Sequence, residues 1–245
     1  MKHPWPVVLA VLIAGLTEFA ATPALAALVN PHPDPNSAVP LLGTTAAMRP
    51  ELEGAVLANV IRPFSINLGP QGTTTGWVQD VVVRSALTGT LDFYYRVHND
   101  SSSNGSIDFA TREGFAGWVT DVDYRVDGPG HYAPTEAYRA ADGNKVWIDL
   151  RRFDTSMFRD RIDTLSPGEE TFFTFIKTNA TSFNEEGLGT VVGYAAQIIG
   201  TFPSGTFSSF QPVATVPLPP AIALLASGLL ILLVGQTRPR IFGPT

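Results

Sequence analysis

Short runs in which apolar and polar residues alternate dominate the middle of the chain, and this is the pattern of β-strands with one buried face. The clearest run is 91–97. Its apolar positions are Leu91, Phe93, Tyr95 and Val97. The positions between them are Asp92, Tyr94 and Arg96. We therefore expect a strand with the first set in the core and the second set facing water.

A second clear run, 118–126, predicts another strand of the same kind. We expect its inward positions to be Trp118, Val122, Tyr124 and Val126. We expect its outward positions to be Asp121, Asp123 and Arg125. Further runs with strand character are 54–61, 77–85, 106–112, 145–150, 171–178, 189–199 and 207–212.

Clusters of Gly, Asn, Asp and Ser separate these runs, as turns require. About nine short strands with period-two alternation predict an all-β fold, a two-sheet antiparallel β-sandwich over residues 51–213. No long amphipathic helix pattern lies between the strands. The only helix-tolerant piece is 153–161, where we expect a single turn or a short helix. Prolines punctuate residues 27–50, which we expect to be a linker.

Composition narrows the class of protein. The chain has a formal net charge of −6 and no cysteine. An acidic chain is repelled by a phosphate backbone, so nucleic acid is not an expected partner. Without cysteine the chain has neither disulfides nor thiolate metal ligands. About 190 residues between the two terminal segments suffice for one domain that relies on an apolar core.

Residues 1–26 have the layout of a secretory signal peptide. Lys2 forms the positive n-region, 7–16 forms the apolar h-region, and Ala24 and Ala26 place small side chains at the two cleavage positions. An uncleaved N-terminal anchor is the alternative, but the apolar run is short for a membrane span. We therefore expect export and cleavage after Ala26.

Residues 214–245 combine a proline-rich approach, an uncharged apolar run and two arginines. We expect a transmembrane helix over about 220–236, with Arg238 and Arg240 held on the cytoplasmic side. At about 1.5 Å per residue, the apolar part of this helix spans roughly 20 Å, less than the ~30 Å thickness of the hydrocarbon core. The segment therefore predicts a membrane anchor of marginal length.

The order of proline motif, apolar helix and basic residues resembles the PEP-CTERM sorting signal of bacterial envelope and exopolysaccharide-associated proteins. The motif residues are Val216, Pro217, Leu218 and Pro219, and the apolar run contains Ser-Gly-Leu-Leu at 227–230. The resemblance implies recognition and processing by an exosortase, a membrane-embedded cysteine protease. An ordinary C-terminal anchor is the alternative. Stretches 89–97, 120–124 and 165–171 also resemble the domain found in many small PEP-CTERM proteins. These stretches have strand-and-turn patterns, so the resemblance supports a β-rich fold and the PEP-CTERM context and implies no chemistry.

No catalytic constellation is evident in the sequence. The histidines between the two terminal segments lack the spacing of a zinc site; they are His32, His98 and His131. The chain has no Gly-x-Ser-x-Gly elbow and no glycine-rich phosphate loop. A triad or a pair of carboxylates assembled from distant residues stays open. We expect a protein that is not an enzyme.

Three aspartates suggest one metal hypothesis. Asp121, Asp123 and Asp127 project from the outer face of one expected strand and its exit turn. Clustered carboxylates can bind Ca²⁺ when a loop adds carbonyl oxygens. The alternative is a solvated acidic face interleaved with Arg125, and no other cofactor is expected.

Aromatic residues raise a second binding hypothesis, since ring faces suit the C–H patches of sugars. The aromatic candidates are Trp77, Trp118, Trp147, Tyr94, Tyr132 and Tyr138. Trp118 belongs to an apolar alternation and is expected in the core, whereas Tyr94 and Trp147 occupy outward positions. We take Tyr94 and Trp147 as the candidate ligand contacts. The alternative is partial burial at a sheet edge.

Together these features predict an exported, non-enzymatic protein of the cell envelope or extracellular matrix. Its expected role is structural or adhesive within a polysaccharide-rich layer, with the membrane and an exosortase as partners before processing. The alternative is a carbohydrate-binding module that acts as a surface lectin, with exopolysaccharide as its partner. A secreted hydrolase is a third and weaker alternative.

Overall fold

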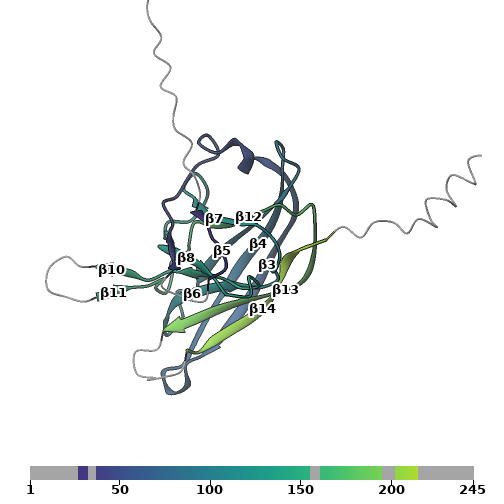
Figure 1. Ribbon diagram of the computed structural model, residues 1–245. Coiled ribbons are helices and arrows are strands. Elements are labelled where there is room, and N and C mark those ends of the chain that lie inside the picture. The colour runs from purple at the N-terminus through teal and green to yellow at the C-terminus, as the bar shows by residue number, and fades with distance from the viewer. Residues whose placement is uncertain (1–26, 33–36, 155–160, 195–201, 215–245) are drawn as a thin grey trace, which may run out of the picture.

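The computed structural model describes residues 27–32, 37–154, 161–194 and 202–214. Within them the protein is all-β, and its strands form two antiparallel sheets (Figure 1). Sheet A has the order β1-β7-β12-β5-β4-β3. Its strands are β1 (Ala27–Leu28), β7 (Thr120–Arg125), β12 (Phe173–Thr178), β5 (Leu91–Asn99), β4 (Thr73–Ser85) and β3 (Gly54–Asn67).

Sheet B has the order β14-β13-β6-β9-β8-β2. Its strands are β14 (Ser204–Val213), β13 (Ser182–Tyr194), β6 (Ser106–Arg112), β9 (Val146–Asp149), β8 (Glu136–Arg139) and β2 (Val39–Pro40). Two 3₁₀ turns, η2 (Pro50–Leu52) and η3 (Gly69–Gln71), flank β3. The expected antiparallel all-β architecture is thus confirmed for the described residues.

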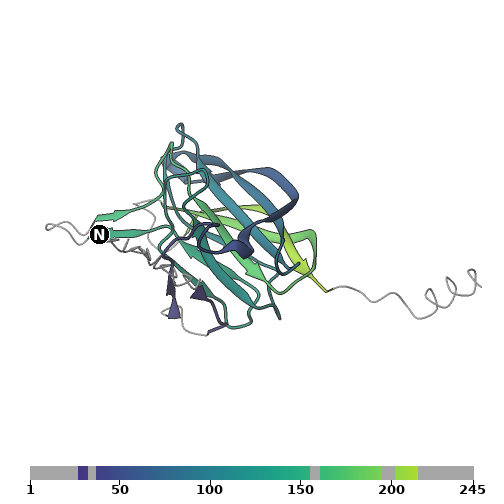
Figure 2. The same ribbon diagram turned by 90° about the horizontal axis from the view of Figure 1, so that it is seen from above.

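The prediction of a turn or short helix over 153–161 is wrong for the described residues of that segment. Residues Arg152–Asp154 form β10 and Arg161–Asp163 form β11, and the two strands pair as an antiparallel hairpin. The hairpin projects away from the sheets in both views (Figure 2). A helix of one or two turns is costly to nucleate, whereas pairing satisfies the backbone groups of both strands directly.

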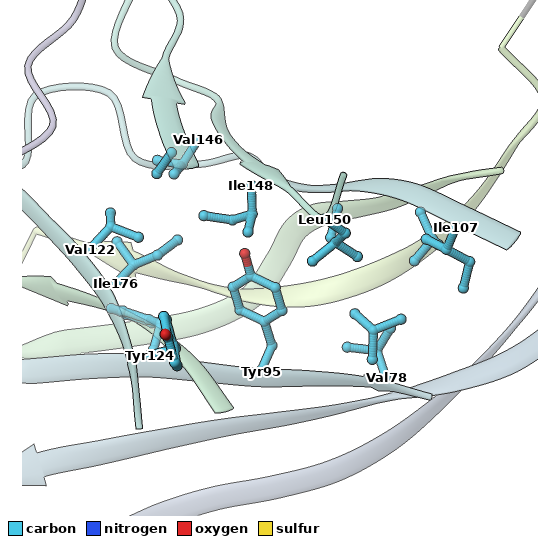
Figure 3. Packing of buried hydrophobic residues seen from close by; sticks show 14 of the residues in the cluster. Val78, Tyr95, Ile107, Val122, Tyr124, Val146, Ile148, Leu150 and Ile176 are labelled. Carbon is cyan, nitrogen blue, oxygen red and sulfur yellow. The ribbon is translucent and has the colours of Figure 1, made fainter. Parts of the chain in front are cut away.

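The main core lies between the two sheets. The four apolar positions of the run 91–97 are all buried there, as their alternation predicts. Tyr95 of sheet A is 2% exposed and points toward Ile148 and Leu150, which belong to the opposite layer (Figure 3). Successive side chains of a strand point to opposite faces, so each strand delivers every second residue to this core.

The run 118–126 is shorter as a strand than its pattern suggests. β7 starts at Thr120, and Trp118 is only half-buried because the amide of Trp118 bonds the carbonyl of Phe115 in a turn at 3.2 Å. Val126 is 44% exposed at the other end. Val122 and Tyr124 do face the core. The prediction that Trp118 and Val126 face the core is therefore wrong, and the prediction for Val122 and Tyr124 is confirmed.

The segment 27–50, expected as a linker, is part of the folded domain over its described residues. β1 pairs with β7, and β2 pairs with β8 at the edge of sheet B. Val29 and Leu41 are buried in the main core. Pro40 is tolerated because an edge strand does not need every backbone donor. The prolines therefore exclude helix here, but they do not exclude edge pairing.

Residues 43–52, called here the covering segment, cross the outer face of sheet A. Leu52 of this segment packs onto the sheet in a second apolar cluster with Val81, Val83, Tyr94 and Phe175. Asp92 of the same face is fully buried, and neither of its carboxylate oxygens has a hydrogen-bond partner among the described residues. The expectation that Asp92 and Tyr94 face water is therefore wrong, because alternation shows which face is outer and does not show what covers it.

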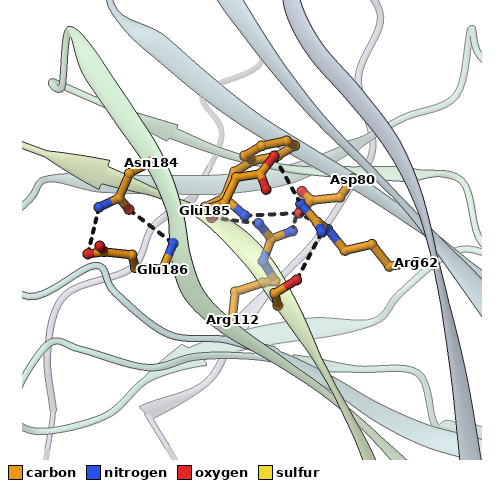
Figure 4. Close-up of polar contacts among 8 residues, drawn as sticks. Arg62, Asp80, Arg112, Asn184, Glu185 and Glu186 are labelled. Carbon is orange, nitrogen blue, oxygen red and sulfur yellow. Dashed lines mark hydrogen bonds and ion pairs between the residues drawn. The ribbon is translucent and has the colours of Figure 1, made fainter.

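A charged group is also buried inside the sandwich, at the side where β14 crosses β3 and β4. Asp80 is 0% exposed and forms ion pairs with Arg112 at 3.0 Å and with Arg62 at 3.2 Å (Figure 4). One Asp80 oxygen accepts the amide of Phe210, and the Arg112 guanidinium donates to the Phe210 carbonyl. These contacts fasten β14 to sheet A. Glu185 extends the network to the surface, 3.8 Å from Arg62.

Candidate functional site

Three aromatic side chains from adjacent strands lie together on the outer face of sheet B. Trp147 of β9 stacks on Tyr138 of β8, with ring centroids 5.4 Å apart and planes 9° from parallel. Phe109 of β6 meets Trp147 edge-on at 6.2 Å. Their sequence neighbours Ala110, Ala137 and Ile148 point into the core, so period two places these three rings outside. We call Phe109, Tyr138 and Trp147 the aromatic strip.

Charged side chains border the aromatic strip. Lys145 lies over Trp147 at 5.3 Å from the ring centroid and pairs with Glu113 at 2.7 Å. Arg151 lies over Phe109 at 4.2 Å. The same guanidinium forms a two-pronged contact with Asp149. Each ring thus has an aromatic or cationic neighbour, which holds its orientation.

Asp108 lies beside these charges and is buried. Burial raises the pKa of its carboxyl to about 6, although nearby Arg151 opposes the rise. Its Oδ1 has no hydrogen-bond partner among the described residues. The strip therefore combines half-exposed rings with polar groups at its border. This is the composition that suits a saccharide, whose faces are apolar and whose edge carries hydroxyls.

Tyr94, the other expected ligand contact, has a different environment. It is 5% exposed, and its hydroxyl donates to the Leu52 carbonyl at 3.2 Å. Burial raises its pKa, and the nearby Asp92 carboxylate raises it further. Phe173 contacts its ring edge-on, and Phe175 contacts it at a tilt. Tyr94 contributes to the wall of an apolar groove of about 560 Å³, but it offers no exposed stacking face.

The structure does not bring the two predicted ligand contacts together. Tyr94 projects from the outer face of sheet A, and Trp147 projects from the outer face of sheet B. The main core separates these faces, so one ligand cannot touch both. Trp118 belongs to neither surface, and Tyr132 is buried with its hydroxyl bonded to the Leu150 carbonyl. Of the two expected contacts, only Trp147 retains its exposure.

The three aspartates proposed for Ca²⁺ contact the covering segment. Asp121 binds Arg49 at 2.8 Å, Asp123 accepts the Gly43 amide at 2.8 Å, and Asp127 accepts the Ala46 amide at 2.8 Å.

Electrostatics agree with this role. The Arg125 guanidinium holds the pKa of Asp127 below its usual value. Burial raises the pKa of Asp123. Across the ranges described, no three acidic or histidine side chains are arranged to hold a metal ion. Protein donors contact at least one oxygen of each of these three carboxylates.

The residues of the two terminal signals lie outside the described residues. They are Ala24, Ala26, Val216, Pro217, Leu218, Pro219, Arg238 and Arg240. Among the residues that the structure describes, no helix has the length and apolar character needed to cross a bilayer.

Sequence reasoning misses Phe109 and the buried charges, and it names Tyr138 as an aromatic candidate without keeping it as a ligand contact. Phe109 and Tyr138 are not singled out as ligand contacts, although both occupy outward positions of short strands. The pairing of Tyr138 with Trp147 across β8 and β9 is a register that only the fold reveals. The partners of Asp80 come from the neighbouring strand β3 and from β6 of the other sheet.

Comparison with known proteins adds no relative. No protein-family model matches the chain, no curated protein matches it, and no solved structure matches it.

Proposed function

We propose that the chain is an exported, non-enzymatic protein of the cell envelope or extracellular matrix, sorted by an exosortase-type protease. The support is the sequence: signal-peptide layout at 1–26, the proline motif at 216–219, the apolar run 221–234 and two arginines beyond it. A β-sandwich of two six-stranded sheets suits such a role, since its outer faces present side chains on a rigid frame.

Within that role, the domain contacts polysaccharide through the aromatic strip. The observation that carries this step is the outward pair of Tyr138 and Trp147, which are stacked across two adjacent strands and bordered by Lys145 and Asp149. Rigid aromatic residues supply contact area at low conformational cost. The bordering charges and hydroxyls can bond the hydroxyl edge of a sugar ring. The adhesive role and the lectin role thus converge on one surface.

Replacement of Trp147 by alanine should abolish most glycan binding. One stacking contact is worth about 0.5–1.5 kcal/mol beyond the area that it buries, so affinity for soluble polysaccharide should fall roughly tenfold. A glycan array identifies the sugar, and titration with that sugar measures the loss. Trp77→Ala is the matched control, because Trp77 is a half-buried outward tryptophan of sheet A.

Equal loss in the two tryptophan variants would contradict a site on sheet B, provided that circular dichroism shows both variants to be folded. Absence of binding by the unaltered protein to any polysaccharide would remove the lectin role and leave a purely structural one.

The sorting proposal predicts the mass of the native protein. The prolines at 217, 219 and 220 keep the backbone extended, so a membrane protease can bind it as a strand. We expect cleavage at or close to the motif at 216–219, which gives a mature chain from Ala27 to near Thr215. Intact-mass measurement of protein from the envelope checks this. A species that still carries Arg238 and Arg240 would identify the segment as a plain anchor.

A further inference from the structure

Large apolar side chains are exposed at the end of the sandwich where β14 finishes. Leu87 is 69% exposed in the turn between β4 and β5, Leu28 is 53% exposed in β1, and Val119 is 52% exposed just before β7. Trp118 beside Val119 is half-buried. We call Leu28, Leu87, Trp118 and Val119 the exit-end cluster.

Three members of this cluster line adjoining hollows, and the fourth, Leu87, is next in sequence to a residue that lines one of them. Leu28, Trp118 and Val119 line one shallow hollow, and a second hollow joins Leu28 and Val119 to Thr88, the neighbour of Leu87. A third hollow joins Trp118 to Val213 and Ala214, where the described chain leaves the sandwich. The cluster therefore borders the point from which residues 215–245 depart.

The chain beyond this point limits how far the domain can lie from a membrane. Six residues, 215–220, separate Ala214 from the apolar run 221–234. Even fully extended, they span only about 20 Å, at about 3.3–3.6 Å per residue. If the apolar run is inserted, the exit-end cluster is held close to the headgroup region, at a high effective concentration. A weak apolar contact is then sufficient for docking.

We propose that the exit-end cluster is a membrane-contact surface, which rests on the lipid interface while the C-terminal segment anchors the chain. This inference depends on the anchoring step of the proposed function. A contiguous exposed apolar patch needs a partner. Tryptophan is one of the side chains most typical of the membrane–water interface. The nearby carboxylate Asp121 is neutralised by Arg49, so it does not oppose the approach to lipid.

The consequence is a domain with a fixed orientation before processing. Strands of the sandwich would stand away from the membrane, with the β4–β5 turn toward it and the start of β4 about 40 Å further out, at about 3.3 Å per residue. The contact would hold Ala214 and the adjoining motif at the interface, where a membrane protease works.

The absence of cysteine from the chain allows a direct test with single-cysteine variants. Leu87→Cys and Val119→Cys place a polarity-sensitive fluorophore in the cluster. Asn104→Cys is the matched control, since Asn104 is exposed and contacts the first residue of β4 at the opposite end. Each full-length variant is reconstituted into phosphatidylcholine vesicles, with and without spin-labelled lipid, and recovered by flotation.

We expect the labels at 87 and 119 to shift to the blue and to lose about half of their fluorescence to spin-labelled lipid, as side chains at interface depth do. The label at 104 should be unaffected. A chain that floats with vesicles but shows equal quenching at all three positions would overturn the membrane-contact surface and leave the anchor intact. Failure to float would overturn the anchor itself, and the contact surface with it.

Discussion

Substitution of Asp80 by asparagine should lower the melting temperature of the domain by about 6–20 °C. The exchange keeps the shape of the side chain but leaves Arg112, which is 0% exposed, without its counter-charge. Removal of one partner from a buried ion pair costs about 3–5 kcal/mol of unfolding free energy. In a domain of this size each kcal/mol is worth about 2–4 °C. Thermal unfolding followed by circular dichroism, with the full chain in mild detergent, measures the change.

The same network contains its own control. Glu185 lies 3.8 Å from Arg62, but its side chain is 62% exposed. An exposed ion pair is worth about 0–1 kcal/mol, so Glu185→Gln should leave the melting temperature nearly unchanged. A similar small effect in Asp80→Asn would mean that β14 is not fastened through this carboxylate.

Replacement of Asp92 by asparagine should stabilise the protein at pH 8 and have little effect at pH 4. Burial raises the pKa of the Asp92 carboxyl to about 7, and the nearby Lys177 and Arg49 charges only partly oppose this. In the unfolded chain the carboxyl loses its proton near pH 4. Between these values the folded state binds the extra proton, so unfolding free energy falls as pH rises.

The size of this effect follows from the two pKa values. A difference of about three units corresponds to a loss of roughly 4 kcal/mol between pH 4 and pH 8. An asparagine side chain has no such proton to lose, so the variant should escape this loss. Melting temperatures at pH 4.5, 6 and 8 test it. Glu186→Gln, an exposed acid bonded only to Asn184 in the described contacts, is the control. Parallel pH curves for Asp92→Asn and the unaltered protein would contradict the prediction.

Strand positions are readable from the sequence because alternation is a local property. Every run expected as a strand overlaps one, and the run 106–112 coincides with β6. The strands that sequence reasoning misses are short: β1 and β2 have 2 residues each, β10 and β11 have 3 each, and β8 has 4. A run of two to four residues contains too few alternations for its sequence pattern to be distinguished from that of a loop. Such strands form because a neighbouring edge accepts them.

The candidate site is less readable because its contacts are long-range. The acidic cluster Asp121, Asp123 and Asp127 is visible in the sequence, but its donors are not. They come from the covering segment, 72, 80 and 81 residues earlier in the chain. Periodicity places Tyr94 and Trp147 outward correctly. It cannot show that the covering segment closes over one of them and leaves the other half-exposed.

The strand order has a consequence for the timing of folding. β12 occupies the place between β5 and β7, and it pairs with a strand about 80 residues earlier. Sheet B is likewise closed by β14, the last strand, which pairs with β13. No early part of the described chain contains a finished sheet, so folding must wait until almost the whole domain has been synthesised. Under the proposed export, a chain that cannot complete its fold early would stay competent to thread through a secretion channel, and its final structure would form on the far side.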